Sequence, residues 1–489
     1  MRRMAPCLWF LLSLAACMVP NPTQPVVSGA GQHMSTEWRR QHPVSADSFA
    51  VKFPVVRTGI LHGKIRYILM ERHSTPTVSV RVSFPCGVSA EPLNAAGIAR
   101  VTGYMLRSGG NASRSASLSR ELGMYGATLE ASIGRDEAGI DVWVPTEGLL
   151  PTLELISGVL SRPSFDDELA QQVRAEVVAE ADRHAQGTSS ASSRARALLY
   201  GEQHAYGRLL SGNSDSVRKL TLVDVAGFYD RCFRPEHALV IIAGDIDQKQ
   251  VEREVSRVFS DWDMGTSAPP DAEPPATAQR PPSSRGRPQV VVQDAPDAKA
   301  ITISMAFGLP GERSTDWPAA IALVRIAAGL KSSRLNFELR EKRSWTYGVS
   351  AAVTPHPDKG DVVFALEIAS ATNVGDALSV ILELFGSLSS VGPTRAELRT
   401  AVKTLVFDTA WDLETNSGAT KRVADLVSGG VHVDVLSSEV DALSHLRVAD
   451  TTEVAERYFD PSRAVIVVRG PETAIMEQLK RANLVPVVK

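Results

Sequence analysis

Arg340 and Tyr347 place a guanidinium and a phenol seven residues apart in the second half of the chain. A phenol O–H can donate to the oxyanion of a tetrahedral intermediate, and a guanidinium can hold a substrate carbonyl or share that charge. Removing one such donor typically raises a reaction barrier by about 2.7–4 kcal/mol. The simpler alternative is that Arg340 is a helix-end cation that satisfies carbonyl groups and that Tyr347 is an ordinary strand aromatic.

A second segment, residues 97–105 (GIARVTGYM), has the frame of a metal-binding helix without its ligands. In the pattern H-x-x-E-H, two histidines on one helix face bind zinc and the glutamate acts as general base. Here Arg100 and Tyr104 occupy the histidine positions, and Gly103 occupies the glutamate position. Arginine stays protonated and has no lone pair to offer a metal. We therefore predict no metal site and no cofactor.

The composition is that of a globular protein large enough for two cores, with 44% hydrophobic and 22% charged residues in 489. The formal net charge of −3, without a run of Lys or Arg, argues against nucleic acid as a partner. No glycine-rich phosphate loop follows a predicted strand, so nucleotide binding has no support either.

The N-terminus has the pattern of a lipoprotein signal. A basic start (MRR) is followed by apolar residues 8–14 and by LAAC at 14–17, which resembles the bacterial lipobox. We expect residues 1–17 to be the signal peptide and Cys17 to carry acyl chains, two or more of which give stable anchoring. Because Met18 is not an aspartate, we expect an outer-membrane lipoprotein that faces the periplasm. The alternative is a plain signal peptide with a chance cysteine.

The chain reads as two similar halves joined by a linker. Pro235 and Pro461 are 226 residues apart, as are Gly244 and Gly470; in each half a helix ends at Phe-x-Pro and an apolar strand then stops at glycine. The stretch between the halves contains seven prolines, which is typical of a semi-extended linker. The expected organisation is signal peptide 1–17, tether 18–48, N-terminal domain 49–264, linker 265–288 and C-terminal domain 289–489.

Neighbouring strands followed by long helices predict an α+β fold. Adjacent strands imply hairpins, so each domain is expected to hold an antiparallel sheet covered by helices. In the first half, the expected elements are strands at 65–70, 77–84, 128–133 and 139–144, and helices at 95–107, 115–125 and after Thr146 and Asp166.

Two cysteines remain in the expected mature domains, Cys86 and Cys232. An oxidising compartment permits a disulfide between them. Both residues lie in apolar sequence beside predicted strands, where a buried free thiol is common. We therefore expect free thiols rather than a bridge.

Together these segments resemble the pitrilysin/insulinase-type zinc peptidases, the group with the inverted zinc motif, and in particular their short bacterial and mitochondrial-processing branch. The resemblance runs from about residue 53 to 484 and includes a closing strand at 236–245 and the S-R-L…R…Y pattern at 333–347. It implies two homologous α+β domains in a clam-shell arrangement. It also implies that Arg340 and Tyr347 face the zinc position across the cleft between the halves.

The family's third zinc ligand is a glutamate whose spacing, counted from Tyr104, falls on Glu180, 76 residues further on. The supporting acid seven residues earlier is replaced by Val173. Zinc needs about three protein ligands, so we expect Glu180 to be a solvated carboxylate or part of a local ion pair. His184 shares a helix face with Glu180, but nothing at the former histidine positions completes a ligand set. His204 matches a family turn in which histidine forms hydrogen bonds.

Loss of the metal motif together with a retained arginine and tyrosine matches one subunit of the family's two-chain members. There, one subunit supplies H-x-x-E-H, the other supplies the arginine and tyrosine, and the two close around unfolded peptide. The resemblance thus implies a metal-free subunit, inactive alone, of a heterodimer with a zinc-bearing homologous peptidase; peptide would bind partly by strand addition. Two alternatives stay open: a catalytically inactive peptide-binding or scaffold protein, and an enzyme active by itself.

Overall fold

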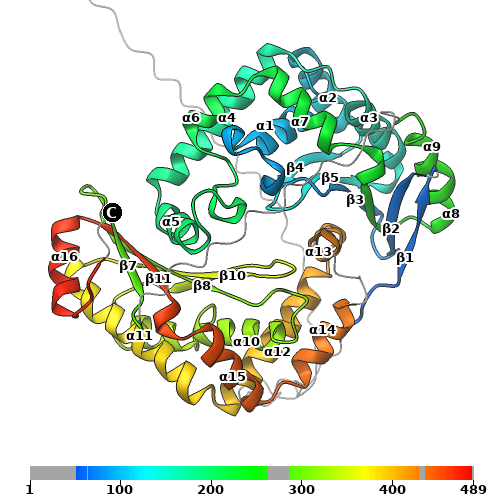
Figure 1. Cartoon of the computed structure of the whole chain (residues 1–489). Coiled ribbons are helices and arrows are strands. Elements are labelled where there is room, and N and C mark those ends of the chain that lie inside the picture. The colour runs from blue at the N-terminus through cyan, green and yellow to red at the C-terminus, as the bar shows by residue number, and fades with distance from the viewer. Residues whose placement is uncertain (1–50, 63, 263–285, 429–434, 487–489) are drawn as a thin grey trace, which may run out of the picture. The chain divides into compact units, whose positions relative to one another are not determined.

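The computed structural model shows two sheets and the helices that cover them, so the predicted α+β fold is confirmed (Figure 1). The expected signal peptide with Cys17, the tether and most of the linker lie outside the described residues. The residues that the structure describes are 51–62, 64–262, 286–428 and 435–486.

The first sheet belongs to the N-terminal half and has the strand order β1-β2-β6-β3-β5-β4. The prediction of an antiparallel sheet is wrong at one pair, because β2 and β6 run parallel, from Arg66 opposite Leu239 to Glu71 opposite Gly244. The chain between these strands contains three further strands of the sheet as well as helices, and it returns to the same end of the sheet before β6 begins. The strands are β1 (Val56–Leu61), β2 (Ile65–Glu71), β3 (Thr77–Phe84), β4 (Thr128–Ile133), β5 (Ala138–Pro145) and β6 (Leu239–Gly244).

The second sheet repeats this plan with the order β7-β11-β8-β10-β9. It corresponds strand for strand to β2-β6-β3-β5-β4 and again contains one parallel pair, β7 with β11, where the other pairs are antiparallel. The closing strands of the two sheets end at Gly244 and Gly470. The strands are β7 (Gln289–Asp294), β8 (Ile301–Gly308), β9 (Val349–Thr354), β10 (Asp361–Ile368) and β11 (Val465–Gly470).

The helices begin where the sequence offers caps. Asp166 accepts from the amide of Leu169 at the start of α4, and Thr221 forms a capping box with Asp224 at the start of α7. The N-terminal helices are α1 (Ile98–Arg107), α2 (Ala112–Met124), α3 (Leu149–Ser161), α4 (Asp167–Gln186), α5 (Ser189–Tyr200), α6 (Ser214–Lys219), α7 (Leu222–Cys232), α8 (Gln248–Gln250) and α9 (Ser256–Val258). The C-terminal helices are α10 (Trp317–Ala327), α11 (Val374–Val391), α12 (Arg395–Asp412), α13 (Asn416–Ser428), α14 (Val435–Ser444), α15 (Val448–Tyr458) and α16 (Glu472–Arg481).

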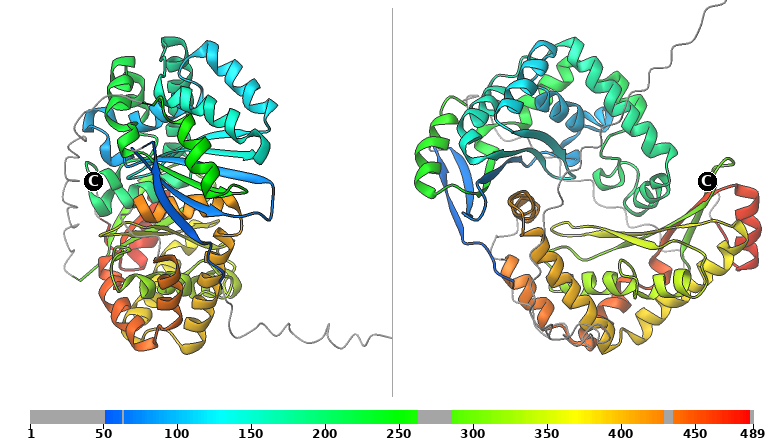
Figure 2. Two further views of the ribbon diagram at one scale, coloured as in Figure 1. Left: turned by 90° about the vertical axis from the view of Figure 1, so that its right-hand side faces the viewer. Right: turned by 180° about the vertical axis from the view of Figure 1, so that it is seen from behind.

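Each sheet packs one face on its own helices, and one helix of the other half packs on part of the opposite face (Figure 2). Helix α5, from the N-terminal half, packs on β8, β10 and β11, where Ala191 and Ala195 meet Ala306, Val363 and Val467. Small residues on both sides let helix and sheet approach closely.

Helix α13, from the C-terminal half, makes the reciprocal contact with the first sheet on β3 and β6. There Ala419, Val423 and Ala424 pack with Ile68 and Ile241 in one buried cluster. We call α5 and α13 the exchanged helices.

Helix α11 is the one helix among the described residues that is long and apolar enough to cross a membrane, by length and composition alone. Its residues Leu378, Ile381 and Phe385 are at most 1% exposed and belong to the core of the C-terminal half. It packs against α15 and α16, which identifies it as a core helix of the fold.

Cys86 and Cys232 form a disulfide, so the expectation of free thiols is wrong. Cys86 follows β3 and Cys232 ends α7, and both are only 2% exposed. The sheet brings the two together although 146 residues separate them in the sequence, a proximity that no local pattern reveals.

Candidate functional site

Helix α1 carries the former zinc-motif positions, and its start is fixed by Gly97 and Glu91. Gly97 has φ +96°, a left-handed conformation that glycine adopts without strain. The Glu91 carboxylate accepts hydrogen bonds from the amides of Gly97 and Ala99, both at 3.1 Å, and so satisfies donors at the helix N-terminus. Burial raises the pKa of Glu91 to about 7, although these two hydrogen bonds act in the opposite direction.

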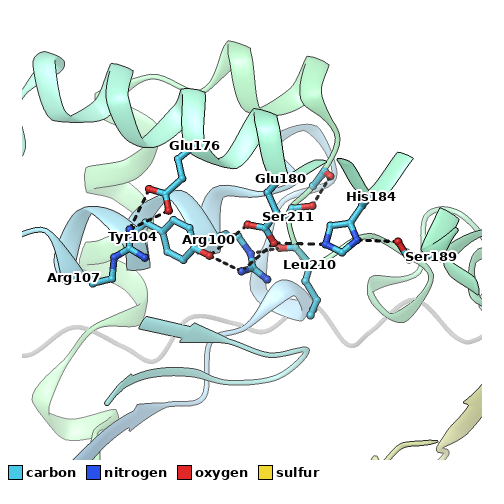
Figure 3. A network of polar contacts seen from close by, with 10 residues as sticks. Arg100, Tyr104, Arg107, Glu176, Glu180, His184, Ser189, Leu210 and Ser211 are labelled. Carbon is cyan, nitrogen blue, oxygen red and sulfur yellow. Dashed lines mark hydrogen bonds and ion pairs between the residues drawn. The ribbon is translucent and has the colours of Figure 1, made fainter. Parts of the chain in front are cut away.

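Arg100 and Tyr104 of α1 meet Glu180 of α4 in one polar cluster (Figure 3). Arg100 Nη1 lies 3.3 Å from Glu180 Oε1 and donates a 2.9 Å hydrogen bond to the Tyr104 hydroxyl. That hydroxyl in turn donates to Glu180 Oε2 at 3.4 Å. Of the two states considered for Glu180, the structure shows the local ion pair.

The cluster extends along α4 in both directions (Figure 3). Arg107 lies over the Tyr104 ring, 4.3 Å from its centroid, and pairs with Glu176 at 3.1 Å. On the other side, His184 Nε2 lies 3.8 Å from Glu180 Oε1, and its Nδ1 is 3.3 Å from the Ser189 hydroxyl at the start of α5. The cluster therefore connects α1, α4 and the first exchanged helix.

Gly103 has no side chain that could act as a base, and the packing around it leaves no room for a longer residue. A Cβ placed on Gly103 would lie 2.7 Å from Ile133 Cδ1 and 3.6 Å from the Ala131 Cβ, both on β4. Such a distance to Ile133 is well inside van der Waals contact, so its side chain occupies space that any longer residue at 103 would need.

Zinc does not fit this cluster. Arg100 places a permanent cation against Glu180, and the other former ligand position holds a phenol that hydrogen-bonds to both residues. Across the part of the chain that the structure describes, no group of three His, Cys, Asp or Glu side chains is arranged to hold a metal ion. The cluster holds helices together by ion pairs and hydrogen bonds.

Arg340 and Tyr347 lie on a segment that is anchored at both ends. Arg334 donates to Glu397 Oε1 at 2.7 Å, which attaches the segment to α12. The Asn336 side chain accepts from the Val349 amide at 2.7 Å and donates to the Val349 carbonyl at 3.2 Å, which fixes the start of β9. Arg340 lies within a π-helical stretch, Asn336–Glu341, and Tyr347 precedes β9.

These two side chains project to solvent and line one pocket of about 630 Å³. Tyr347 is fully exposed and the Arg340 side chain is 39% exposed. Across the pocket lie Thr188, Ser189 and Ser192 at the start of α5. Ser189 thus touches the Arg340–Tyr347 pocket on one side and, through His184, the Glu180 cluster on the other.

The sequence placed Glu180 beside Arg100 and Tyr104, and placed Arg340 with Tyr347, but it missed the residues that position them. Glu91 was missed; its signal is an acidic residue a few positions before a helix that starts at glycine. His204 accepts a hydrogen bond from the Tyr206 amide at 3.1 Å, the kind of role expected for it.

Fold and site together describe a chain of two similar α+β halves, in the first of which Arg100, Tyr104 and Glu180 form a polar cluster between α1 and α4. Residues 66–199 match the family model described as insulinase (peptidase family M16), and residues 219–405 match the peptidase M16 inactive domain. The chain belongs to the M16, or insulinase, family of peptidases.

Several curated bacterial proteins are similar in sequence. An uncharacterised zinc protease of Streptomyces coelicolor is 28% identical over 46% of this chain and 48% of its own length, so the match spans about half of that relative. An uncharacterised zinc protease of Mycobacterium leprae is 26% identical over 70% of this chain and 75% of its own length.

Solved structures share the fold. A peptidase M16 inactive domain from Pseudomonas fluorescens has a TM-score of 0.76 at 21% identity and covers 85% of this chain and 98% of that one. A protease from Helicobacter pylori has a TM-score of 0.77 at 19% identity, with 86% and 100% covered. A chain of complex III2 from Candida albicans has a TM-score of 0.73 at 17% identity, with 88% and 99% covered.

Proposed function

We propose that this chain is the metal-free subunit of a heteromeric zinc endopeptidase. The zinc would be held by a homologous partner, while Arg340 and Tyr347 would bind the peptide and stabilise the oxyanion of the transition state. In this chain, Arg100, Tyr104 and Gly103 would serve to stabilise the N-terminal half. The alternative is a catalytically inactive peptide-binding or scaffold protein of the same fold.

The observation that carries the proposal is the full exposure of Tyr347 beside the exposed Arg340 guanidinium. A tyrosine that serves only the fold buries its ring, and Tyr347 buries none of it. The nearest acid to Arg340 is its neighbour Glu341, at 3.6 Å and itself 48% exposed, a surface contact that contributes little. Both groups are therefore free for an external ligand.

The test is reconstitution with a homologous M16 subunit that carries an intact H-x-x-E-H motif. Each chain alone is expected to be inactive on an unstructured peptide and the mixture active. Arg340→Ala and Tyr347→Phe should each lower kcat of the mixture by about 10²–10³, the usual effect of losing an oxyanion donor. Arg253→Ala, a change at a 73% exposed arginine of the N-terminal half, is the control. Unchanged activity in both variants would leave only the scaffold role.

We also propose that the chain is anchored to the periplasmic face of the outer membrane through acylated Cys17. The LAAC sequence before Met18 supports this proposal. Cys17→Ser should move the protein from the membrane fraction to the soluble periplasmic fraction. Retention of the variant in the membrane fraction would contradict the anchor.

A further inference from the structure

The pocket beside Arg340 lies at one end of the second sheet, next to the start of the exchanged helix α5. Helix α5 covers Ala306 of β8, and Ser192 of α5 contacts Ser304 of the same strand at 3.0 Å. Two residues earlier, on the same face of β8, Thr302 lines the pocket. The start of α5 forms the adjacent wall, and a helix N-terminus carries partial positive charge.

The charges around this pocket are mainly positive. Lys331 and Arg340 line it, opposed by one carboxylate, Glu367, which is exposed. Among the described residues Lys331 forms no ion pair, and Arg340 pairs with Glu341 alone. Two cations thus face the pocket without strong internal partners, and a cation of this kind prefers an anionic ligand.

A buried hydroxyl gives an independent indication of a ligand. Thr302 is 3% exposed, and its Oγ1 has no hydrogen-bond partner within the described part of the chain. Nearly all buried polar groups in proteins are paired, so the Thr302 hydroxyl lacks a partner that a ligand could supply once the side chain rotates its hydroxyl toward the pocket.

We propose that this pocket binds a carboxylate of the peptide, either the C-terminal carboxylate or an acidic side chain. The inference rests on the proposed function, because the peptide would be the one that Arg340 and Tyr347 hold. Lys331 can pair with a carboxylate, and the Arg340 guanidinium has enough N–H donors to add one hydrogen bond to it beside its contact with the reacting carbonyl. After rotation of its side chain, the Thr302 hydroxyl can also donate to a carboxylate oxygen. The chain would thereby select peptides that present a negative group beside the Arg340–Tyr347 pair.

The test measures binding by the chain alone, so it is independent of peptidase activity. The affinities of four fluorescent, unstructured peptides are measured by anisotropy. Two peptides have a free C-terminus and two have an amidated one, and in each pair one peptide contains an internal Glu where the other contains Gln. Removal of the recognised carboxylate should weaken binding to the unmodified chain about tenfold, as expected for a charge-assisted contact. Dependence on amidation identifies the C-terminus as the source, and dependence on Glu→Gln identifies a side chain.

The variants form a thermodynamic cycle with these peptides. In Lys331→Gln, and in Thr302→Val, the same removal should weaken binding by clearly less than tenfold, because each variant already lacks one of the contacts to the carboxylate. Lys359→Gln, at an exposed lysine of the β9–β10 turn outside the pocket lining, should behave like the unmodified chain. The inference would be overturned if the unmodified chain bound all four peptides with equal affinity, or bound none of them. It would also be overturned if Lys331→Gln weakened the binding of peptides with and without the recognised carboxylate by the same factor. The reconstituted peptidase assay decides the proposed function separately.

Discussion

The Arg100 guanidinium and the Glu180 carboxylate face each other at 3.3 Å, which joins α1 to α4. In the metal-binding relatives implied by the motif, a zinc ion would link these two helices. Here a positive side chain compensates the same acidic residue. The ion pair therefore joins the two helices without a metal ion.

Removal of Arg100 should destabilise the chain through the acid it leaves behind. Glu180 is only 18% exposed, so in Arg100→Met we expect the free energy of unfolding to fall by about 1–3 kcal/mol. Urea denaturation measures this change. Adding Glu180→Gln should restore most of the loss, because the buried charge is then gone. If the double variant loses as much stability as the sum of the losses in Arg100→Met and Glu180→Gln, the two residues are not coupled.

Gly103 should tolerate substitution less well than a matched glycine on α2. An added methyl at 103 meets Ile133 Cδ1, whereas one at Gly123 meets nothing within 4 Å. Gly123→Ala should stabilise the chain by about 0.5–1 kcal/mol through helix propensity. Gly103→Ala should be about 1–3 kcal/mol less stable than that variant. Because Ile133→Val deletes the contacting Cδ1 atom, it should relieve part of the cost; an equal effect of both glycine changes would disprove the close contact.

The Cys86–Cys232 disulfide should contribute measurably to stability. It closes a loop of 146 residues, and loss of such a bridge typically costs about 2–5 kcal/mol. We expect dithiothreitol to lower the Tm of the unmodified chain and to leave the Tm of Cys86→Ala/Cys232→Ala unchanged. Alkylation of Cys86 and Cys232 themselves, located by mass spectrometry in the non-reduced, unfolded chain, would show instead that the bridge is absent.

Glu397 should give the C-terminal half an acid-sensitive contribution to stability. Burial raises its pKa, but hydrogen bonds from Arg334 and Thr394 outweigh this and hold the pKa at about 2, below the ordinary value of about 4.3. A lowered pKa stabilises the folded chain above the unfolded value and loses that effect as the pH falls from about 4.3 through about 2. Because the group is partly exposed, we expect about 1 kcal/mol.

The measurement is urea denaturation of Glu397→Gln and the unmodified chain between pH 7 and pH 3. The difference in unfolding free energy should be about 1 kcal/mol at pH 7 and should narrow below pH 4.3. Glu383→Gln, at an exposed carboxylate on α11, is the control. A difference that stays constant with pH would contradict the assigned pKa.

The sequence predicted those strands that read as alternating or continuously apolar runs. The expected strand at 77–84 is found without change as β3, and that at 65–70 as β2, which ends at Glu71. Strand β1 was missed because Gly59 interrupts its pattern. That glycine is needed because an added Cβ would lie 2.4 Å from the Tyr67 ring, a contact between strands that a local pattern does not contain.

Contacts between residues far apart in the sequence also limit how much of the candidate site the sequence can predict. Spacing placed Glu180 near Arg100 because both lie on helices that a family pattern aligns. The parallel pairing of β2 with β6, the disulfide and the role of Thr302 depend on chain segments far apart in sequence. Each is determined by tertiary packing, which overrides local preference.

We expect the contacts of the exchanged helices to hold the two halves together even when the covalent connection between them is cut. Each half covers the other's sheet with a helix that is embedded in its own sequence, α5 on β8 and α13 on β3. A protease cut within residues 265–288 should therefore yield two fragments that still migrate as one particle. Either half expressed singly would expose the apolar residues that the exchanged helix covers, among them Ile68 and Ile241 in the first sheet and Val363 and Val467 in the second, and we expect it to aggregate.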